Sequence, residues 1–430
     1  MESFHKIVTV NNLQHHCPIQ PITGLDIGYP TGGAGLVLVY QQVLNREVLI
    51  ASLQKALDRV PYFAGRIVAL ESSQPLVVPN NEGVLFSHAH YRERMPRYEI
   101  SRPLKPQIHE FVPYIDSCGF DRHTPLLQIK LSTFLQGSIL GIAVSHVFCD
   151  GISTIDFLNS WAAYARNASA PAAPAWQRHT LKSVAEDSDK SNLPTAMIEL
   201  EQPLQFYAEL VACEIFHLPA ALLERLYKKY GTVDTAAASP ANILTAYIFL
   251  TLARCRLQAD EPCSLTLVYN TRKILGLASD YLGNAVALRS LQWTCKQIIE
   301  LGVAALARSI RQLYPAITAN DLRREQKFME QKMTDGTAAQ FLPEASYRML
   351  TGGVLINNVA KFPLYDLDFG SGRPIWYEAP PQPVPTPVCR GVLICPTPPE
   401  RDGVDIHVTL PSAEMIIFSK LVGRMADPVT

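Results

Sequence analysis

The chain has 430 residues, of which 48% are hydrophobic and 18% are charged, as in a globular protein. With 38 basic and 39 acidic residues its formal net charge is -1, so composition gives no global preference for nucleic acid or an anionic membrane. Single cores seldom grow beyond roughly 250 to 300 residues, so this length predicts two domains. An alanine- and proline-rich stretch at 167–174, followed by polar residues, predicts a linker at 181–200 between domains at 1–180 and 201–430.

The cysteines and the apolar stretches also bound the class of protein. Nine cysteines without CxxC spacing predict neither a disulfide framework nor a zinc site, and they favour a reducing compartment. The start of the chain lacks the long apolar region of a signal peptide, and no stretch reaches the roughly 18 apolar residues of a membrane span. We therefore expect a cytoplasmic protein with no metal, nucleic-acid or membrane partner. We also expect a monomer.

In the first half, local patterns predict strands and helices in alternation. Asn45 can cap a helix that runs to Val60, where Pro61 follows. Two apolar runs, 128–135 and 138–145, are separated by a Gln-Gly pair and predict a hairpin. We further expect strands at 35–43 and 66–70 and a helix at 152–166.

The second half repeats this mixture, which predicts an α/β fold with mixed sheets. Five prolines within 378–387 predict an ordered loop or an edge strand there. The expected helices are 219–230, 240–257, 296–313 and 321–332, and the expected strands are 206–216, 264–269, 352–357 and 404–410.

His146 stands at the end of the strand 138–145, just before the chain turns into the helix 152–166. A neutral imidazole can accept a proton near pH 7, and Gly151 permits the tight turn. Taken alone, His146 and Asp150 also fit a satisfied polar pair, and two residues at this spacing do not make a metal site. Cys149 fits a small buried residue better than a nucleophile.

Five stretches in chain order resemble the BAHD acyltransferases of the CoA-dependent acyltransferase superfamily. The HxxxDG motif corresponds to His146–Gly151, and the DFGWG motif to Asp368, Phe369, Gly370, Ser371 and Gly372. Ser371 stands where the family has tryptophan, which indicates a divergent branch and puts the packing of that loop in doubt. Weaker matches are found at 61–66, 270–272 and 281–285.

The resemblance implies two similar domains, each with a mixed sheet and flanking helices, and an active-site channel between them. It implies transfer of an acyl group from acyl-CoA, a co-substrate rather than a permanently bound cofactor, to a hydroxyl or amine of a small secondary metabolite. His146 would be the general base. The motif residues Asp368, Phe369, Gly370 and Gly372 would be structural.

Other residues have roles that the resemblance leaves open. Asp150 either orients His146 as in a triad or pairs with Arg272, which the resemblance favours. Asn357 either donates a hydrogen bond to the oxyanion or satisfies a strand end, and Gly151 can contribute its N–H. Asn284 and Thr271 are candidates for contact with CoA.

Two other classes of function stay open. A related condensation or cyclisation enzyme would use the same histidine without CoA, although Ser145 replaces the extra histidine found in the condensation relatives. A ligand-binding homologue without turnover is the second, and the intact His146, Asp150 and Gly151 argue against it.

Overall fold

The structure is a computed structural model. It describes residues 2–11, 17–27, 33–68, 74–96, 108–115, 125–169, 174, 197–202, 211–231, 238–256, 259–380 and 390–426. Most of the expected linker at 181–200 and most of the proline-rich segment 378–387 lie outside these residues. The division into domains at 1–180 and 201–430 therefore stays a prediction.

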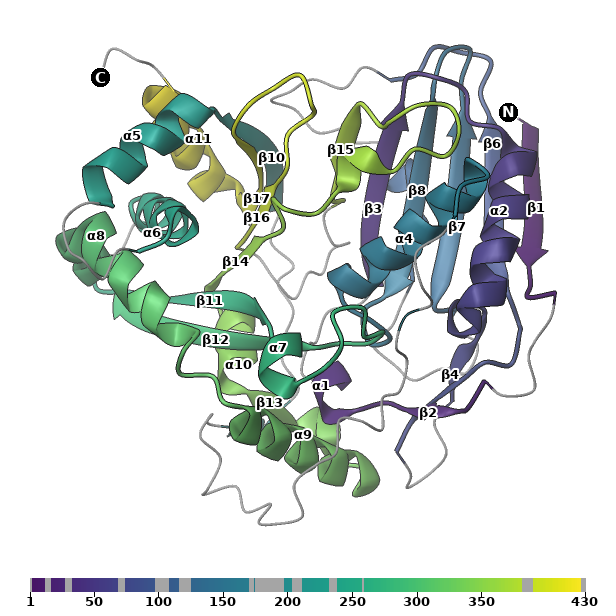
Figure 1. Cartoon of the computed structure of the whole chain (residues 1–430). Helices are drawn as coiled ribbons and strands as arrows, with labels where there is room; N and C mark the ends of the chain where they lie inside the picture. The colour runs from purple at the N-terminus through teal and green to yellow at the C-terminus, as the bar shows by residue number, and fades with distance from the viewer. Residues whose placement is uncertain are drawn as a thin grey trace.

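The first half is built on a six-stranded mixed sheet with the order β1-β6-β7-β8-β3-β15, in which only β6 and β7 pair in parallel. Its strands are β1 (Glu2–Val8), β3 (Gly33–Tyr40), β6 (Val84–His90), β7 (Leu127–Thr133), β8 (Ser138–Ser145) and β15 (Trp376–Glu378). Helices α2 (Arg46–Arg59) and α4 (Gly151–Ala165) cover one face (Figure 1). Every residue of β8 is buried, which explains its continuous apolar sequence.

The second half has its own six-stranded mixed sheet, with the order β10-β17-β16-β14-β11-β12 and parallel pairing of β14 with β11 and β16. Its strands are β10 (Val211–Leu218), β11 (Pro262–Asn270), β12 (Val286–Thr294), β14 (Val354–Asn358), β16 (Gly391–Cys395) and β17 (Val404–Pro411). Its covering helices are α5 (Ala220–Tyr230), α6 (Pro240–Ala253), α8 (Cys295–Leu313) and α11 (Ser412–Ala426) (Figure 1). The predicted α/β fold with two similar halves is thus confirmed.

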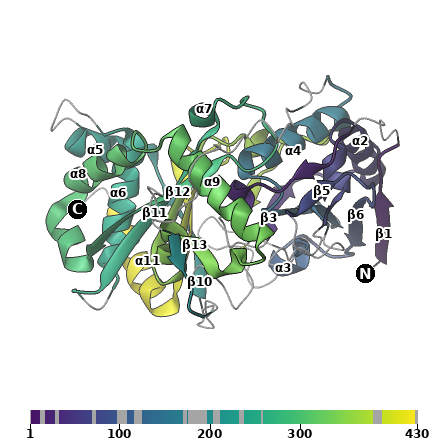
Figure 2. The ribbon, with the colours of Figure 1, turned by 90° about the horizontal axis from the view of Figure 1, so that it is seen from below.

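Smaller elements connect the two halves, and helix α9 (Ala319–Thr334) lies across their junction in the view from below (Figure 2). Strand β15 belongs to the first sheet although it follows β14 in the chain, because Trp376 pairs with Val39. The remaining elements are β2 (Gln20–Pro21), α1 (Gly24–Ile27), η1 (Pro61–Ala64), β4 (Arg66–Val68), β5 (Leu76–Val78), α3 (Ile108–Phe111), β9 (Met197–Glu199), α7 (Arg272–Leu275), α9 (Ala319–Thr334), η4 (Ala338–Gln340), β13 (Phe341–Pro343), α10 (Glu344–Leu350) and η5 (Leu364–Asp366).

Most expected elements are present, with shifts at their ends. Asn45 caps α2 by accepting from the N–H groups of Glu47 and Val48, as predicted. The β7–β8 hairpin is also confirmed, but its turn centres on 135–136, because Phe134 bonds to the carbonyl of Gly137, whose φ is +87°. The helix expected at 240–257 ends at Ala253, and the strand expected at 35–43 is 33–40.

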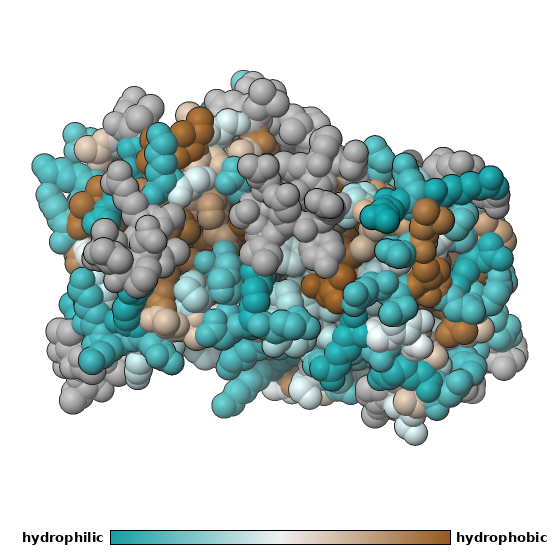
Figure 3. Space-filling view, turned by 90° about the horizontal axis from the view of Figure 1, so that it is seen from above, coloured by the Kyte–Doolittle hydropathy of each residue, from teal (hydrophilic) through white to brown (hydrophobic). Residues whose placement is uncertain are grey.

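The surface seen from above is mainly hydrophilic, with hydrophobic residues in separate groups (Figure 3). In the part of the chain that the structure describes, no helix is both long enough and apolar enough to cross a bilayer.

Candidate active site

A cavity of about 420 Å³ lies between the two halves. One wall comes from β3, the turn after β8 and the first turn of α4, and the other from β11, β12 and β14. His146 and Asn357 both line it, one from each half. The structure thus brings together the two side chains that were predicted to act on the reacting atoms, and most of the other lining residues are apolar.

The turn that carries His146 packs on the core of the first half. Phe148 N–H bonds to the carbonyl of Ser145 over 3.1 Å, so the chain turns directly after β8. The Phe148 ring is buried edge-on against Phe63, with centroids 4.9 Å apart. Cys149 is also buried, with its Sγ 3.6 Å from Oγ1 of Thr154, as expected for a packing residue. His146 lies half-buried at the edge of this packed turn and faces the cavity.

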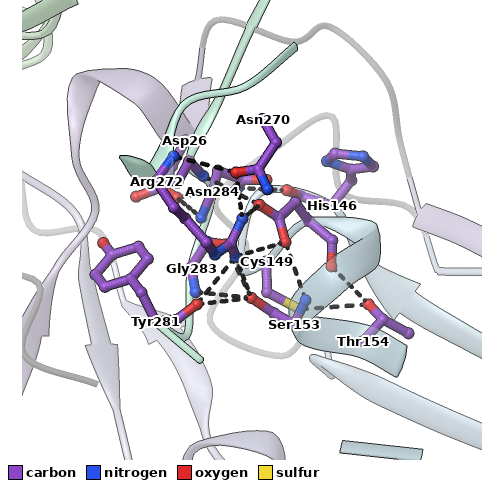
Figure 4. A network of polar contacts seen from close by, with 12 residues as sticks. Asp26, His146, Cys149, Ser153, Thr154, Asn270, Arg272, Tyr281, Gly283 and Asn284 are labelled. Atoms are coloured by element: carbon purple, nitrogen blue, oxygen red, sulfur yellow. Dashed lines mark hydrogen bonds and ion pairs between the residues drawn. The ribbon is translucent and has the colours of Figure 1, made fainter. Parts of the chain in front are cut away.

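Asp150 caps α4, and its carboxylate is filled by four donors. Oδ1 accepts from the N–H of Ser153 at 3.0 Å and from Arg272 Nη2 at 2.9 Å. Oδ2 accepts from Arg272 Nη1 at 2.7 Å and from the N–H of Ala285 at 3.1 Å. A carboxylate offers about four acceptor positions, so these bonds leave none for the imidazole of His146. In Figure 4 that imidazole points away from Arg272 and Ser153.

Arg272 begins α7 in the second half, and its guanidinium reaches the turn in the first half (Figure 4). Besides Asp150, it donates to Ser153 Oγ at 3.0 Å and to the Tyr281 carbonyl at 2.9 Å. Arg272 and Asp150 are only 3% and 2% exposed. The predicted buried ion pair between the halves is confirmed. Arg272 donates one hydrogen bond to each carboxylate oxygen of Asp150, so the pair has a defined geometry and its charges neutralise each other.

Two ionisable groups around the site, Tyr377 and Asp156, have shifted pKa values. Burial raises the pKa of Tyr377, which lines the cavity, well above its usual value, so its hydroxyl stays protonated. Desolvation also raises the pKa of Asp156 on α4, although Arg272 opposes this shift. Within the described residues, no group of three or more His, Cys, Asp or Glu side chains is placed to hold a metal ion.

Asn284 and Thr271 lie behind the cavity rather than in its lining. Both are 0% exposed, and Thr271 donates its N–H to the Ala285 carbonyl over 2.8 Å. Asn284 Nδ2 donates to the carbonyl of His146 over 2.8 Å. Their predicted contact with CoA stays a prediction that this placement does not support. Sequence reasoning missed Ser153, whose only local signal is its place three residues after the helix cap.

The loop Asp368–Gly372 lies at the opposite end of α4 from His146. Asp368 Oδ1 accepts from the N–H groups of Gly370 at 2.8 Å and Gly372 at 3.0 Å, which closes the loop. Phe369 is buried against Trp161, with ring centroids 4.6 Å apart. Arg166, at the end of α4, donates to the Asp368 carbonyl. A 15-residue helix is roughly 22 Å long, so this loop does not reach the cavity.

Comparison with known proteins places this geometry in a family. The sequence model of the Transferase family matches residues 37–424, across both halves. The chain belongs to this family, the BAHD acyltransferases. Rosmarinate synthase of Plectranthus scutellarioides is 25% identical to this BAHD chain over 383 residues, covering 86% of the chain and 85% of the relative. A hydroxycinnamoyl-CoA:5-hydroxyanthranilate N-hydroxycinnamoyltransferase of Avena sativa is 25% identical over 408 residues, with 88% and 86% covered.

A solved structure shows the same fold. TRI101 of F. graminearum, complexed with coenzyme A and deoxynivalenol, superimposes with a TM-score of 0.74 at 15% identity, covering 93% of this chain and 96% of the other. The match to the family model over both halves confirms the predicted family, and the chain is an acyltransferase.

Proposed function

We propose that this BAHD acyltransferase moves an acyl group from a CoA thioester to a hydroxyl or amine of a small secondary metabolite, with His146 as the general base. The observation that carries the proposal is the cavity between the halves. His146 faces it, while Asp150, four residues later, is occupied by Arg272. The imidazole is thus the group available to take a proton from a bound acceptor.

The reaction balances without a covalent enzyme intermediate. His146 takes the proton of the acceptor hydroxyl or amine while its oxygen or nitrogen attacks the thioester carbon. The tetrahedral intermediate collapses as the carbon–sulfur bond breaks, and the protonated His146 gives its proton to the departing CoA sulfur. A general base of this kind contributes about a hundredfold to ten-thousandfold in rate.

Asn357 is proposed to stabilise the oxyanion that forms during the attack. It lies on β14, between β11 and β16, and faces the same cavity as His146 from the opposite wall. Its amide nitrogen can donate a hydrogen bond, and its backbone is held by pairing with Leu393 on β16. The N–H of Gly151, at the mouth of the same turn, is a second candidate donor.

Asp150 is proposed to be structural rather than part of a triad. Its four bonds hold the start of α4 against the second half and leave the orientation of His146 to other groups. Because one chain supplies both walls of the cavity, we also propose that the monomer is active.

The acceptor is proposed to be a small, mainly apolar molecule with one reactive hydroxyl or amine. The size and apolar lining of the cavity support this class. The name of the Avena sativa relative gives a hydroxycinnamoyl-CoA donor and N-acylation, whereas TRI101 is complexed with deoxynivalenol, so both kinds of acceptor belong in the test.

The test is release of CoA thiol from a panel of acyl-CoA donors with pooled alcohols and amines, and mass spectrometry of the products. We expect acceptor-dependent release that falls at least about a hundredfold in His146→Ala, with an unchanged melting temperature. A folded protein that releases no CoA from any donor would reject acyl transfer. Product formed from a thioester or free substrate without CoA release would favour the condensation or cyclisation enzyme, whose fold is shared at a TM-score of 0.59 by a condensation domain.

A further inference from the structure

The backbone of His146 is held by a side chain from the other half. Asn284, in the loop before β12, is 0% exposed. Its Nδ2 donates to the carbonyl of His146 over 2.8 Å (Figure 4). The same nitrogen lies 3.4 Å from the carbonyl of Val147. This contact acts on the main chain from which the imidazole projects, so it bears directly on where that imidazole lies in the cavity.

Asn284 is in turn oriented by a buried carboxylate near the start of the chain. Asp26, in α1, is 1% exposed, and its Oδ1 accepts from Asn284 Nδ2 at 3.0 Å and from the Asn284 N–H at 3.3 Å. Its Oδ2 accepts from the N–H and Oγ1 of Thr23 at 2.7 and 2.9 Å. Because Nδ2 has two hydrogens and an acceptor on each side, the orientation of the Asn284 amide is determined.

Helix α1 is itself packed tightly against α9, so Asp26 does not sit on a loose end. A Cβ on Gly24 would lie only 2.1 Å from the Gln326 carbonyl oxygen, which shows how closely the two backbones approach. The Gly24 N–H also faces Glu330 Oε1 at 3.4 Å. Gly24 thus holds α1 against α9, and Asp26 connects α1 through Asn284 to the turn at His146.

We infer that Asp26 and Asn284 are positioning residues for His146. The inference rests on the proposed role of His146 as the general base. A base must lie within hydrogen-bond reach of the proton it takes, and a misplacement of about 1 Å can lower the rate a hundredfold. Neither side chain is among the described residues that line the cavity, so both act through the His146 backbone.

Asn284→Ala and Asp26→Asn test this role. Asn284→Ala removes the hydrogen bonds that Nδ2 donates to the His146 carbonyl and to Asp26. Asp26→Asn keeps the size and shape of the side chain, but its NH2 group cannot accept a hydrogen bond and so faces the donors of either Asn284 or Thr23. We expect each to lower kcat by about a hundredfold, with KM changed by less than about threefold. The double variant should lose no more than Asn284→Ala alone, because both act along one path.

Ser138→Ala is the matched control. Ser138 is 0% exposed and accepts from the Leu44 N–H at 2.8 Å, but it lies at the opposite end of β8 from His146. It should lower the melting temperature and leave kcat unchanged. A merely structural role would make the Asn284 and Asp26 variants behave in the same way, with lower stability and full kcat, and that result would overturn the inference.

The acidity of the acceptor supplies a second readout. The acyl donor is a hydroxycinnamoyl-CoA, and the acceptor is either benzyl alcohol or its more acidic α-trifluoromethyl derivative. The rate is measured as release of CoA. A more acidic hydroxyl depends less on a general base, so the deficit of each variant should shrink with the second probe, as it should for His146→Ala. An equal deficit with both probes would refute positioning. If Asn284→Ala does not fold, the isosteric Asp26→Asn carries the same comparison.

The His146→Ala protein separates the two ideas. If it retains full activity, the proposed function fails and the inference fails with it. If it loses activity while Asn284→Ala and Asp26→Asn keep theirs, only the positioning role is rejected.

Discussion

The two ends of α4 are fixed by opposite kinds of interaction. At its N-terminal end, buried charges and hydrogen bonds join Asp150 and Ser153 to Arg272. At its C-terminal end, the rings of Trp161 and Phe369 pack together, and the loop that follows closes on itself. Both ends are covered by segments from the second half of the sequence.

This difference separates the end of α4 near His146 from the end that carries the departure from the family motif. Directional bonds with fixed geometry hold the end that carries His146, whereas apolar packing holds the other end, roughly 22 Å away. Ser371, which replaces the tryptophan of the family motif, belongs to the packed end. The departure from the motif therefore lies in a loop that does not line the cavity.

Arg272→Ala should have the largest effect, because it leaves Asp150 buried without its cation. We expect a loss of about 3 to 5 kcal/mol in the free energy of unfolding, measured with urea, and a lower kcat. Arg348→Ala is the control, since its pair with Glu344 is 25% and 34% exposed and should contribute about 1 kcal/mol or less. Intact stability with a selective loss of rate would contradict the structural role of the Asp150–Arg272 pair.

Asn357→Asp tests the wall opposite His146. The change keeps the shape of the side chain but replaces the donor NH2 with a carboxylate oxygen, which would repel the developing oxyanion. We expect kcat to fall by about a hundredfold to a thousandfold, measured by CoA release, with the melting temperature nearly unchanged. Full activity would mean that Asn357 only satisfies the strand end and that His146 acts without this partner.

Local patterns in the sequence were enough to predict the elements that carry His146. The continuous apolar run of β8, the glycine after Asp150 and the helical stripe of α4 all lie within about thirty residues. Local patterns could not predict the ion pair, because Asp150 and Arg272 are 122 positions apart and no periodicity connects them. Only the family resemblance predicted it.

Contacts between distant segments were the main omission. The pairing of β15 with β3 and the bonds from Asn284 to Asp26 join parts of the chain that no local pattern relates. Asn284 and Thr271 were predicted to be candidates for contact with CoA. In the folded chain, Asn284 satisfies buried main-chain and carboxylate groups, which is the more general reason for a buried amide.

Gly370→Ala and Gly372→Ala form a matched pair at the packed end. Both have left-handed φ values, +92° and +98°, so alanine should cost about 1 to 2 kcal/mol at either. A Cβ at 370 would lie 3.2 Å from the Ala165 carbonyl oxygen, whereas one at 372 meets no heavy atom within 4 Å. Urea unfolding should show the larger loss for Gly370→Ala, with kcat unchanged in both. A lower kcat would show that this end of α4 also affects the chemistry.

Asp156→Asn should have the smallest effect and tests the charge balance at the polar end. Desolvation raises the folded-state pKa of Asp156, Arg272 opposes the shift and Asp150 adds to it. Its contribution to stability is therefore present below the ordinary pKa of about 4 and is lost as the pH rises through the folded pKa.

The variant should thus be more stable than the unaltered protein at pH 7. Because Asp156 is exposed and solvent screens its charge, the gain should be about 0.5 kcal/mol or less, and it should disappear toward pH 4. Urea unfolding at the two pH values measures it. A variant that is less stable at pH 7 would mean that attraction to Arg272 outweighs desolvation and repulsion from Asp150. The guanidinium would then serve two carboxylates on α4, and the network that fixes the catalytic end would extend one turn further along the helix.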